Sequence, residues 1–597
     1  MLLARATRTQ SLGNIQVSRK QQGYDKDSTL LSFGIKLLSA LAAQSLPLED
    51  SMLHQVKLLT FSAILLAPLF SLCNAQEMGP HKHSDGEKLG RVHFATSCSS
   101  GMQIEFDRAV AMLHSFWYEK AGETFAEIAR REPSCAIAYW GVAMTGYHPL
   151  WEKPNAEALK NGWEAVEKAK AINAKTDRER DYIAALSAFY KDYAKIDHLT
   201  RVLAYEQAME QLHAKYPDDR EAGVFYSLAL IASAQSLPPD RTYSREKKAA
   251  DILNKVLSVE PQHPGVIHYL IHAYDVPQLA HLALNAARTY ARIAPSVPHA
   301  LHMPSHIFTR LGLWQESIQS NIASEAAAKK FAAEMRMDGA WDQQLHAMDY
   351  LMYAYLQGAQ DKQAKALLDE LYQIRKTSPE NFIGGYAFAA IPARYAIERR
   401  QWSEAASLKV YPSQFPWNRI PWAEAVTYFA RALGEARTGD VASARRDIDK
   451  LNSLENALSD AKERSQVEIQ RLAASAWVAH AEGNKEEALR LMQSAADLED
   501  TTEKHPVTPG PIVPAREMLG DLLLELGKPD QALKEFEVSL ITSPNRFGSL
   551  LGAARAANLM KNAEKARSYY SKLEAICNHA DGNRVELQEA KTFLRGK

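Results

Sequence analysis

Histidine is concentrated in one short part of the chain, where its spacing could hold a metal ion. Seven of the 19 histidines lie between His263 and His306, and two pairs, His268/His272 and His302/His306, are four residues apart. On an α-helix this spacing places two imidazoles on one face, one turn apart, within reach of a single ion such as zinc. The pairs also recur after 34 residues, from 268 to 302 and from 272 to 306. We therefore expect them on equivalent helices of two neighbouring units.

Several interpretations of these four histidines remain open. If they hold zinc or another divalent transition metal, with Asp349 as a ligand or an orienting group, the chain is a metal-binding protein or a metal-dependent hydrolase. The proline between the second pair, Pro304, lies either in the first turn of its helix or at a point where it disturbs the i, i+4 geometry, which counts against the metal. Alternatively, the imidazoles form hydrogen bonds between helices or line a peptide groove. Together with Arg310 they could also form a pH-sensitive cluster that binds a carboxylate.

The elements that must position these histidines are predicted to be helices in a repeat. From about residue 101 onward, apolar residues recur at three and four positions, alanine is abundant, and sustained strand-like alternation is missing from the sequence. A glycine, an alanine, an aromatic residue and a proline recur in a fixed order, most clearly at Gly520, Ala532, Phe536 and Pro544. This order resembles the tetratricopeptide repeat. The resemblance implies an all-α, right-handed α-solenoid of about ten helix pairs over residues 101–580.

The resemblance also implies where a ligand would bind. In tetratricopeptide proteins the fifth and ninth positions of a unit face the concave groove, and the paired histidines fall at those positions. We expect the groove to be lined by Trp140, His268, His272, Asp275, His302, His306, Arg310, His346, Asp349 and Tyr353. The leading hypothesis is therefore a scaffold that binds a protein or peptide there. The sequence contains no HExxH, GxSxG or phosphate-loop motif, so a catalytic function is not indicated.

Five short strings give the resemblance a narrower form, because together they are similar to a family of bacterial secreted tetratricopeptide-repeat proteins. That similarity implies no reaction. The strings are His93–Cys98, Ala138–Met144, His268–Asp275, His302–Phe308 and Val507–Pro511.

The N-terminal region predicts export. A weakly basic start at Met52 is followed by an apolar run, Leu58–Leu72, and by small residues before Gln76, which is the layout of a cleavable signal peptide rather than a membrane span. We expect a non-native or disordered extension over 1–51, the signal peptide over 52–75 and a flexible N-terminus over 76–100. A C-terminal helix or tail is expected over 581–597. The predicted location is the periplasm or the extracellular space.

Charge and cysteine content narrow the function classes. Lys and Arg total 70 against 71 Asp and Glu, which does not favour nucleic-acid binding. In an oxidising compartment Cys98 and Cys135 could pair, which would leave Cys577 as a thiol.

The proline-rich stretch Thr502–Pro514 is predicted to be a connection into the last two repeats. A small-molecule carrier stays open as a third function and would require an enclosed apolar pocket.

Overall fold

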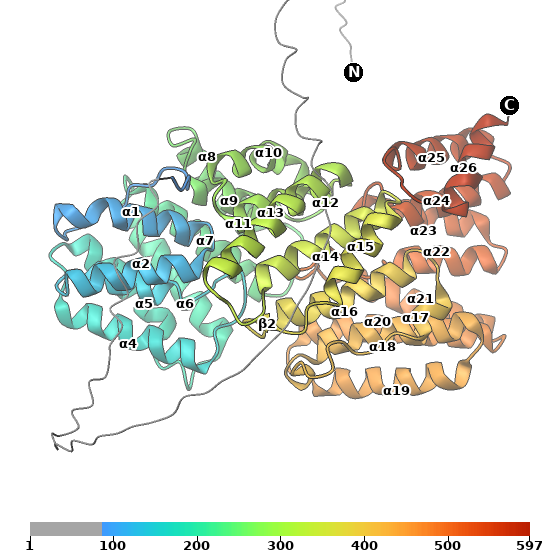
Figure 1. Cartoon of the computed structure of the whole chain (residues 1–597), viewed down its shortest axis with the longest axis horizontal. Helices are drawn as coiled ribbons and strands as arrows, with labels where there is room; N and C mark the ends of the chain where they lie inside the picture. The colour runs from blue at the N-terminus through green and yellow to red at the C-terminus, as the bar shows by residue number, and fades with distance from the viewer. Residues whose placement is uncertain (1–85, 597) are drawn as a thin grey trace, which may run out of the picture. The chain divides into compact units, whose positions relative to one another are not determined.

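The periodic apolar residues form helices, and each helix buries the face on which its apolar side chains lie. In α2 (Tyr118–Arg131), Ala121, Phe125 and Ile128 are buried at intervals of four and three residues. Because this spacing lines one face of a helix, α2 packs through that face against the helices before and after it in the chain. The computed structural model, drawn in Figure 1, describes residues 86–596. The predicted extension (1–51) and signal peptide (52–75) lie outside the described residues.

Consecutive helices pack as pairs, and each pair packs on the next. The first six pairs are α1 (Ser100–His114) with α2, α3 (Ala136–Met144) with α4 (Ala156–Ile172), α5 (Asp177–Tyr190) with α6 (His198–Lys215), α7 (Arg220–Ser236) with α8 (Ser244–Leu257), α9 (Pro264–Ala273) with α10 (Leu284–Ile293), and the short α11 (Pro298–His302) and α12 (Pro304–Arg310) with α13 (Trp314–Glu334).

Six further pairs follow in the same manner, and a last helix covers the end. They are α14 (Asp342–Gln357) with α15 (Asp361–Leu371), α16 (Phe382–Ile397) with α17 (Trp402–Ala406), α18 (Pro421–Thr438) with α19 (Val441–Ala457), α20 (Ala461–Ala481) with α21 (Lys485–Asp500), α22 (Ala515–Glu525) with α23 (Pro529–Thr542), and α24 (Phe547–Leu559) with α25 (Ala563–Ile576), before α26 (Val585–Arg595). The described residues thus contain twelve pairs, where about ten were expected.

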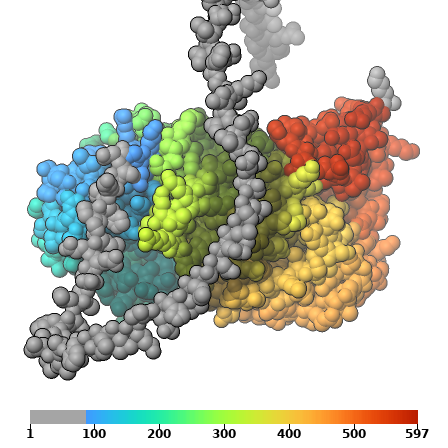
Figure 2. Space-filling view, viewed as in Figure 1, coloured from blue at the N-terminus to red at the C-terminus, as the bar shows by residue number. Residues whose placement is uncertain are grey.

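The remaining elements are small. Two 3₁₀ turns, η1 (Ala280–Ala283) and η2 (Trp417–Arg419), and two strands, β1 (Ala340–Trp341) and β2 (Thr377–Ser378), complete the described part. The strands pair in parallel, with Ala340 opposite Thr377. In the space-filling view the colours succeed one another in chain order across the surface, as expected when each pair contacts mainly its neighbours (Figure 2). The prediction of an all-α solenoid of tetratricopeptide-type hairpins is confirmed.

The glycine and aromatic positions of the repeat explain how closely the helices approach. A Cβ added to Gly520 on α22 would lie 2.7 Å from the ring of Phe536 on α23, and one added to Gly141 on α3 would lie 2.3 Å from the ring of Phe125 on α2. A methyl group does not fit at either distance. The glycines are therefore required for the contact, as the repeat pattern indicates.

The segment before α1 is packed against the array rather than separate from it. Phe94 is fully buried, its backbone N–H donates to Asp107, and the N–H of Arg91 donates to the carbonyl of Gln262. Cys98 and Cys135 form a disulfide with their Cα atoms 5.1 Å apart. These contacts do not fit a flexible N-terminus over the described part of 76–100. Burial of Phe94 against Trp140 and Tyr182 supplies the physical reason.

The proline-rich connection has a second role in the fold. Residues 501–514, which we call the strap, link α21 to α22 and lie against helices far earlier in the chain. The carbonyl of Thr508 accepts a hydrogen bond from Tyr350 on α14 at 3.2 Å, and the carbonyls of Gly510 and Pro511 accept from Arg394 on α16. Both helices are the first of their pairs, so the strap covers part of the face that was expected to bind a ligand. Among the described helices, none is both long and apolar enough to cross a membrane.

Candidate functional site

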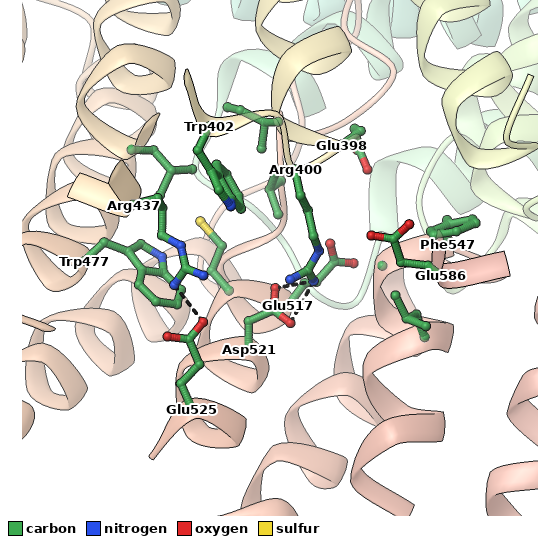
Figure 3. A pocket seen from close by; sticks show the side chains of 16 residues that line it. Glu398, Arg400, Trp402, Arg437, Trp477, Glu517, Asp521, Glu525, Phe547 and Glu586 are labelled. Atoms are coloured by element: carbon green, nitrogen blue, oxygen red, sulfur yellow. Dashed lines mark hydrogen bonds and ion pairs between the residues drawn. The ribbon is translucent and has the colours of Figure 1, made fainter. Parts of the chain in front are cut away.

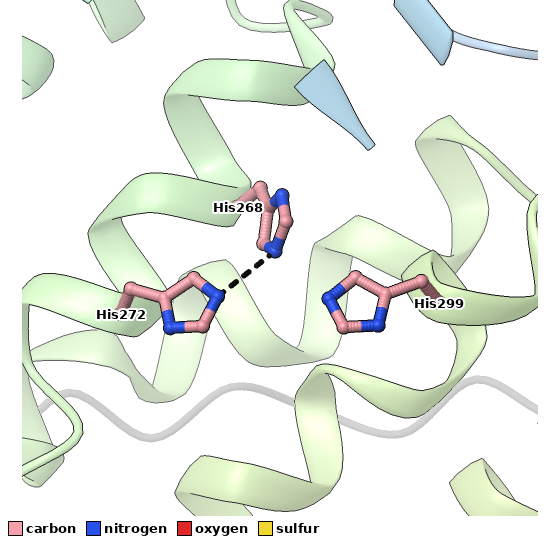
Figure 4. Close-up of side chains that lie close together, drawn as sticks. All are labelled: His268, His272 and His299. Carbon is pink, nitrogen blue, oxygen red and sulfur yellow. Dashed lines mark hydrogen bonds between the residues drawn. The ribbon is translucent and has the colours of Figure 1, made fainter. Parts of the chain in front are cut away.

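Six histidines meet where α9, α11, α12 and α14 come together. None is more than 7% exposed, so the imidazoles are shielded from bulk water. They form two groups in which one ligand atom from each ring lies within 4.8 Å of the others. Set A is defined as His268, His272 and His299, and set B as His302, His306 and His346. Figure 4 shows the three rings of set A turned toward one another from two separate helices.

The hydrogen bonds around two rings of set B, His302 and His306, indicate which ring nitrogen carries the proton. His302 Nδ1 lies 2.6 Å from Oδ1 of Asn321, and the amide nitrogen of Asn321 donates to the carbonyl of Ser317 at 2.8 Å. The amide oxygen therefore faces His302, and Nδ1 of that ring is the donor. His306 Nδ1 donates to the carboxylate of Asp275 at 2.9 Å. Both rings thus point a proton-free Nε2 inward when they are neutral.

These two Nε2 atoms are only 3.0 Å apart. With both Nδ1 atoms protonated, neither neutral ring has a proton to place between them, so two lone pairs face each other. An imidazolium would supply that proton, but burial lowers the pKa of both His302 and His306. A charge on His306 lowers the pKa of His302 further, whereas Asp275 opposes the shift at His306 without reversing it. A cation bound by both nitrogens removes the conflict. Metal-bound histidines have this arrangement, in which the other ring nitrogen donates to a carboxylate or carbonyl.

The break at Pro304 does not prevent the contact. α11 ends at His302 and α12 begins at Pro304, so the expected single helix is two short ones joined at Met303. The backbone N–H of His306 donates to the carbonyl of Met303, which keeps the two helices close to one continuous turn. The i, i+4 relation between the imidazoles therefore survives the proline.

Two rings of set A also have an outer hydrogen bond through Nδ1. His268 Nδ1 donates to the carbonyl of His114 at 2.7 Å, and His299 Nδ1 lies 3.2 Å from Oε1 of Gln343. His272 Nε2 lies 3.1 Å from His268 Nε2. The Nε2 atoms of His299 and, in set B, His346 are buried without a hydrogen-bond partner. A buried polar atom that lacks a partner costs free energy, so each is a position where a ligand is expected.

The charges beside set B are balanced among protein groups. Asp275 accepts from Lys504 Nζ at 2.8 Å and from Arg310 Nε at 2.9 Å, in addition to His306. Burial would raise the pKa of Asp275, but Lys504, Arg310 and His306 together hold it well below its ordinary value. Burial lowers the pKa of Lys504 to about 8. The carboxylate is thus already neutralised by two cations before any metal ion binds.

A third cluster with metal-like spacing is explained without a metal. His114, Glu221 and His263 lie close together and are fully buried. Both histidines bond through Nε2 to the carboxylate of Glu221, at 2.9 and 3.0 Å. His263 Nδ1 accepts from the N–H of Val266 and caps α9, and His114 Nδ1 bonds to the hydroxyl of Tyr269. Because every ring nitrogen has a hydrogen-bond partner, we interpret this cluster as a hydrogen-bond network that stabilises the fold.

The residues expected in the ligand groove fall into several places. The four histidines predicted to bind metal and His346 lie within sets A and B, and Asp275 and Arg310 border set B. Asp349 and Tyr353 lie apart: Asp349 is paired with Arg394, so it is not a ligand here, and the Tyr353 hydroxyl accepts from Arg546.

Trp140 was also expected in the groove but is only 1% exposed. Phe94 of the packed N-terminal segment stacks on its ring, and Tyr182 and Phe225 contact it edge-on. Sequence reasoning omitted His299 and Lys504. His299 carried a signal, since it is three residues before His302. Nothing local marked Lys504, which contacts Asp275 across 229 residues of sequence.

A second feature lies on the first helices of the C-terminal pairs. A hollow lined mainly by α16, α18, α20, α22 and α24 contains two arginines whose charges are paired, as Figure 3 shows. Arg400 contacts Asp521 at 2.8 Å, and Arg437 contacts Glu525 at 2.7 Å. The guanidinium of Arg437 also lies 5.3 Å from the ring centre of Trp402 and 4.2 Å from that of Trp477. The enclosed volume of about 40 Å³ is far below the ~300–1,000 Å³ of small-molecule sites, which does not favour the carrier hypothesis here.

Comparisons with known proteins find similarity among solved structures only. No family model and no curated protein matches the chain. Among solved structures, a tetratricopeptide repeat protein from Parabacteroides merdae is 14% identical over 50% of this chain and 99% of its own, with a TM-score of 0.27. The Cut9-Hcn1 complex of the APC/C is 13% identical over 83% and 96%, with a TM-score of 0.25. A monomeric mutant of IFIT1 bound to Gppp-AAAA is 12% identical over 74% and 90%, with a TM-score of 0.35. No ligand or activity follows from these similarities, and the resemblance to a bacterial secreted family stays a prediction.

Proposed function

We propose that this helical repeat protein binds a transition metal ion through set B. The observation that carries the proposal is the pair of proton-free Nε2 atoms of His302 and His306 at 3.0 Å, each held in place through its Nδ1. The partnerless Nε2 of His346 completes three imidazole ligands. Imidazole ligands suit zinc, copper, nickel and iron better than calcium or magnesium.

Three protein ligands leave a coordination position for a small molecule. In zinc enzymes three ligands with an open position are typical of catalytic sites, whereas structural sites use four. A metal ion bound there would polarise a ligand or activate a water molecule. The residues of this chain would orient the imidazoles and exclude bulk water, and the hydroxyl of Tyr350, 3.3 Å from His306 Nε2, is placed to hydrogen-bond a group at the open position.

Metal binding is tested by titrating the purified, metal-stripped chain with Zn²⁺ and with Co²⁺, whose visible absorption reports its ligands. We expect stoichiometric binding in the parent and a loss in His302→Ala and His346→Ala that exceeds the ~10–100-fold typical of an outer hydrogen-bond partner. His281→Ala is the matched control, because His281 is an exposed histidine outside both sets. Equal affinity of the parent and the two set B variants would refute the proposal.

A second candidate function is favoured by the hollow of Figure 3. It lies mainly on first helices and is bordered by two tryptophans. Five carboxylates and only two arginines line it, so the lining keeps an acidic excess although Asp521 and Glu525 are each paired with an arginine. Such a surface fits a polypeptide segment with basic side chains, which agrees with the leading hypothesis from the sequence. Titration with an oligolysine peptide should quench the fluorescence of Trp402 and Trp477. A Glu525→Gln, Glu586→Gln double variant should bind it more weakly than the parent does, and an unchanged response to peptide would count against this candidate.

Export to the periplasm or the extracellular space is part of the proposal. The Cys98–Cys135 disulfide supports it, because disulfides persist mainly in oxidising compartments. Expression of the full chain in a bacterial host, followed by N-terminal sequencing of the periplasmic fraction, should find a mature chain that begins at Gln76. A chain retained intact in the cytoplasm would contradict export.

A further inference from the structure

Set A repeats the ligand geometry of set B one unit earlier in the chain. His268 and His272 occupy the positions that His302 and His306 occupy 34 residues later, and a histidine from a neighbouring helix completes each set, His299 in set A. In Figure 4 the partnerless side of His299 faces the other two rings. The ligand types and the spacing are shared, and each set has one buried Nε2 without a hydrogen-bond partner, on His299 in set A and on His346 in set B. Set A is therefore a second candidate for a metal ion.

The two sets also adjoin each other. His299 of set A and His302 of set B are on the same short helix, α11, and their ring centres are 5.9 Å apart. The ring centres of His272 and His306 are likewise 5.9 Å apart. The two sets therefore share a wall made of imidazoles, and no backbone element separates them at these points.

We propose that the centre is dinuclear, with one transition-metal ion on set A, a second on set B, and a small anion such as hydroxide bound between them. The proposal rests on the proposed function, since it requires metal binding at set B. It goes further in assigning a second site and a ligand class. Two-metal sites commonly place their ions ~3.5–4 Å apart and hold an oxygen ligand that both can reach.

The charge balance is the reason for the anion. All six ligands are neutral imidazoles, and the carboxylate that contacts set B, Asp275, is already paired with Lys504 and Arg310. Two divalent ions would therefore add uncompensated positive charge to a buried site, which is unfavourable. A bridging hydroxide, formed when a metal-bound water releases a proton to solvent, lowers that charge and fills the open position of both sets.

The test uses Cu²⁺, because magnetic coupling between two bridged ions removes their EPR signal. The purified full chain is stripped, loaded with Cu²⁺ and measured for copper per chain and for EPR-visible spins per chain. We expect two copper ions and far fewer than two spins in the parent. His272→Ala, which opens set A, and His346→Ala, which opens set B, should each bind one copper ion with one full spin. His281→Ala should behave as the parent does.

The outcomes separate the two proposals. One copper per parent chain, unaffected by His272→Ala but lost in His346→Ala, would overturn the dinuclear centre and leave metal binding at set B intact. Two copper ions with two full spins would show that the ions are not magnetically coupled, and would overturn the proposal that they lie close together and share a bridging anion. No stoichiometric copper in the parent would overturn both proposals. If either variant does not fold by circular dichroism, His299→Ala replaces the first and His302→Ala the second.

Discussion

Asp342 lies at the first turn of α14, one helical turn before His346, and its carboxyl group allows a quantitative test of the environment around the histidine centre. The side chain is 3% exposed and accepts hydrogen bonds from Trp151 Nε1 at 3.3 Å and Asn381 Nδ2 at 2.8 Å. Burial raises its pKa from 3.8 to about 6, against the opposing effect of those donors. The ring of Trp151 in turn packs edge-on against His299 and His346. The carboxyl group thus lies beside the wall of the centre.

The raised pKa determines the sign of the pH dependence. A carboxyl group whose pKa is higher in the folded chain than in the unfolded chain stabilises the fold when it is protonated. That stabilisation is complete below pH 3.8 and is lost as the pH rises through 6. A shift from 3.8 to about 6 corresponds to about 3 kcal/mol at neutral pH. Between pH 4.5 and 7.5 the change amounts to about 2 kcal/mol.

Asp342→Asn removes this titration and leaves an amide oxygen to accept from Trp151 and Asn381. We expect the free energy of opening α14 to rise relative to the parent by about 2 kcal/mol more at pH 7.5 than at pH 4.5. Any pH-independent cost of the substitution cancels in that difference. Native-state hydrogen exchange of peptides within α14, corrected for intrinsic exchange rates, measures the opening free energy at both pH values. Asp338→Asn is the control, since that side chain is 88% exposed.

If the free energy of opening α14 differs between Asp342→Asn and the parent by the same amount at both pH values, the reasoning is refuted, because the carboxyl group then titrates normally. A bound metal ion supplies a further check. Positive charge at His346, one turn away, lowers the pKa of Asp342. Zn²⁺ should therefore shift the pH dependence of the opening free energy to lower pH in the parent and leave the opening free energy of the variant independent of pH.

Three further predictions address the site and the fold. Asn321→Leu removes the acceptor that orients one ring of set B and should weaken Zn²⁺ binding about 10–100-fold in a competition titration, whereas Ser324→Ala on the same helix should not. Replacing Cys98 and Cys135 with serine should lower the free energy of unfolding by about 4 kcal/mol for their separation of 37 residues. Reduced parent protein should then match the variant in a denaturant titration. Gly520→Ala should cost about 1–3 kcal/mol in the same assay, because the new methyl group meets an aromatic ring at 2.7 Å, and an unchanged midpoint would contradict that close contact.

The sequence was informative wherever a property recurs with the repeat. The helices, the glycine and aromatic seam, and the relation between the pairs His268/His272 and His302/His306 all follow from spacing, because a repeat places equivalent residues in equivalent surroundings. His299 escaped this reasoning because the equivalent position 34 residues earlier is a glycine, Gly265. Its membership of set A depends on which way α11 faces after the turn that precedes it.

The strap is an example of what the sequence could not predict. Its prolines predicted a connection, and it is one, but the pattern held no information about the helices on which it lies. The contacts that place it join Lys504 to Asp275 and the carbonyl of Thr508 to Tyr350, across 229 and 158 residues. Such contacts depend on the assembled shape of the first helices, so a stretch read locally could not reveal that it covers the expected ligand groove.

Two groups of fully buried charges lie under and beside the strap. Arg394 is fully buried with Asp349, and Arg546 is fully buried with Glu398 and Glu517. Replacing such buried ion pairs by apolar residues is often neutral or stabilises the fold by about 1–4 kcal/mol. Here Arg394 joins the strap to α14, the helix that carries His346, and Arg546 joins α14 to α16 and α22. Rigid support of this kind is what a metal centre requires of the groups around its ligands.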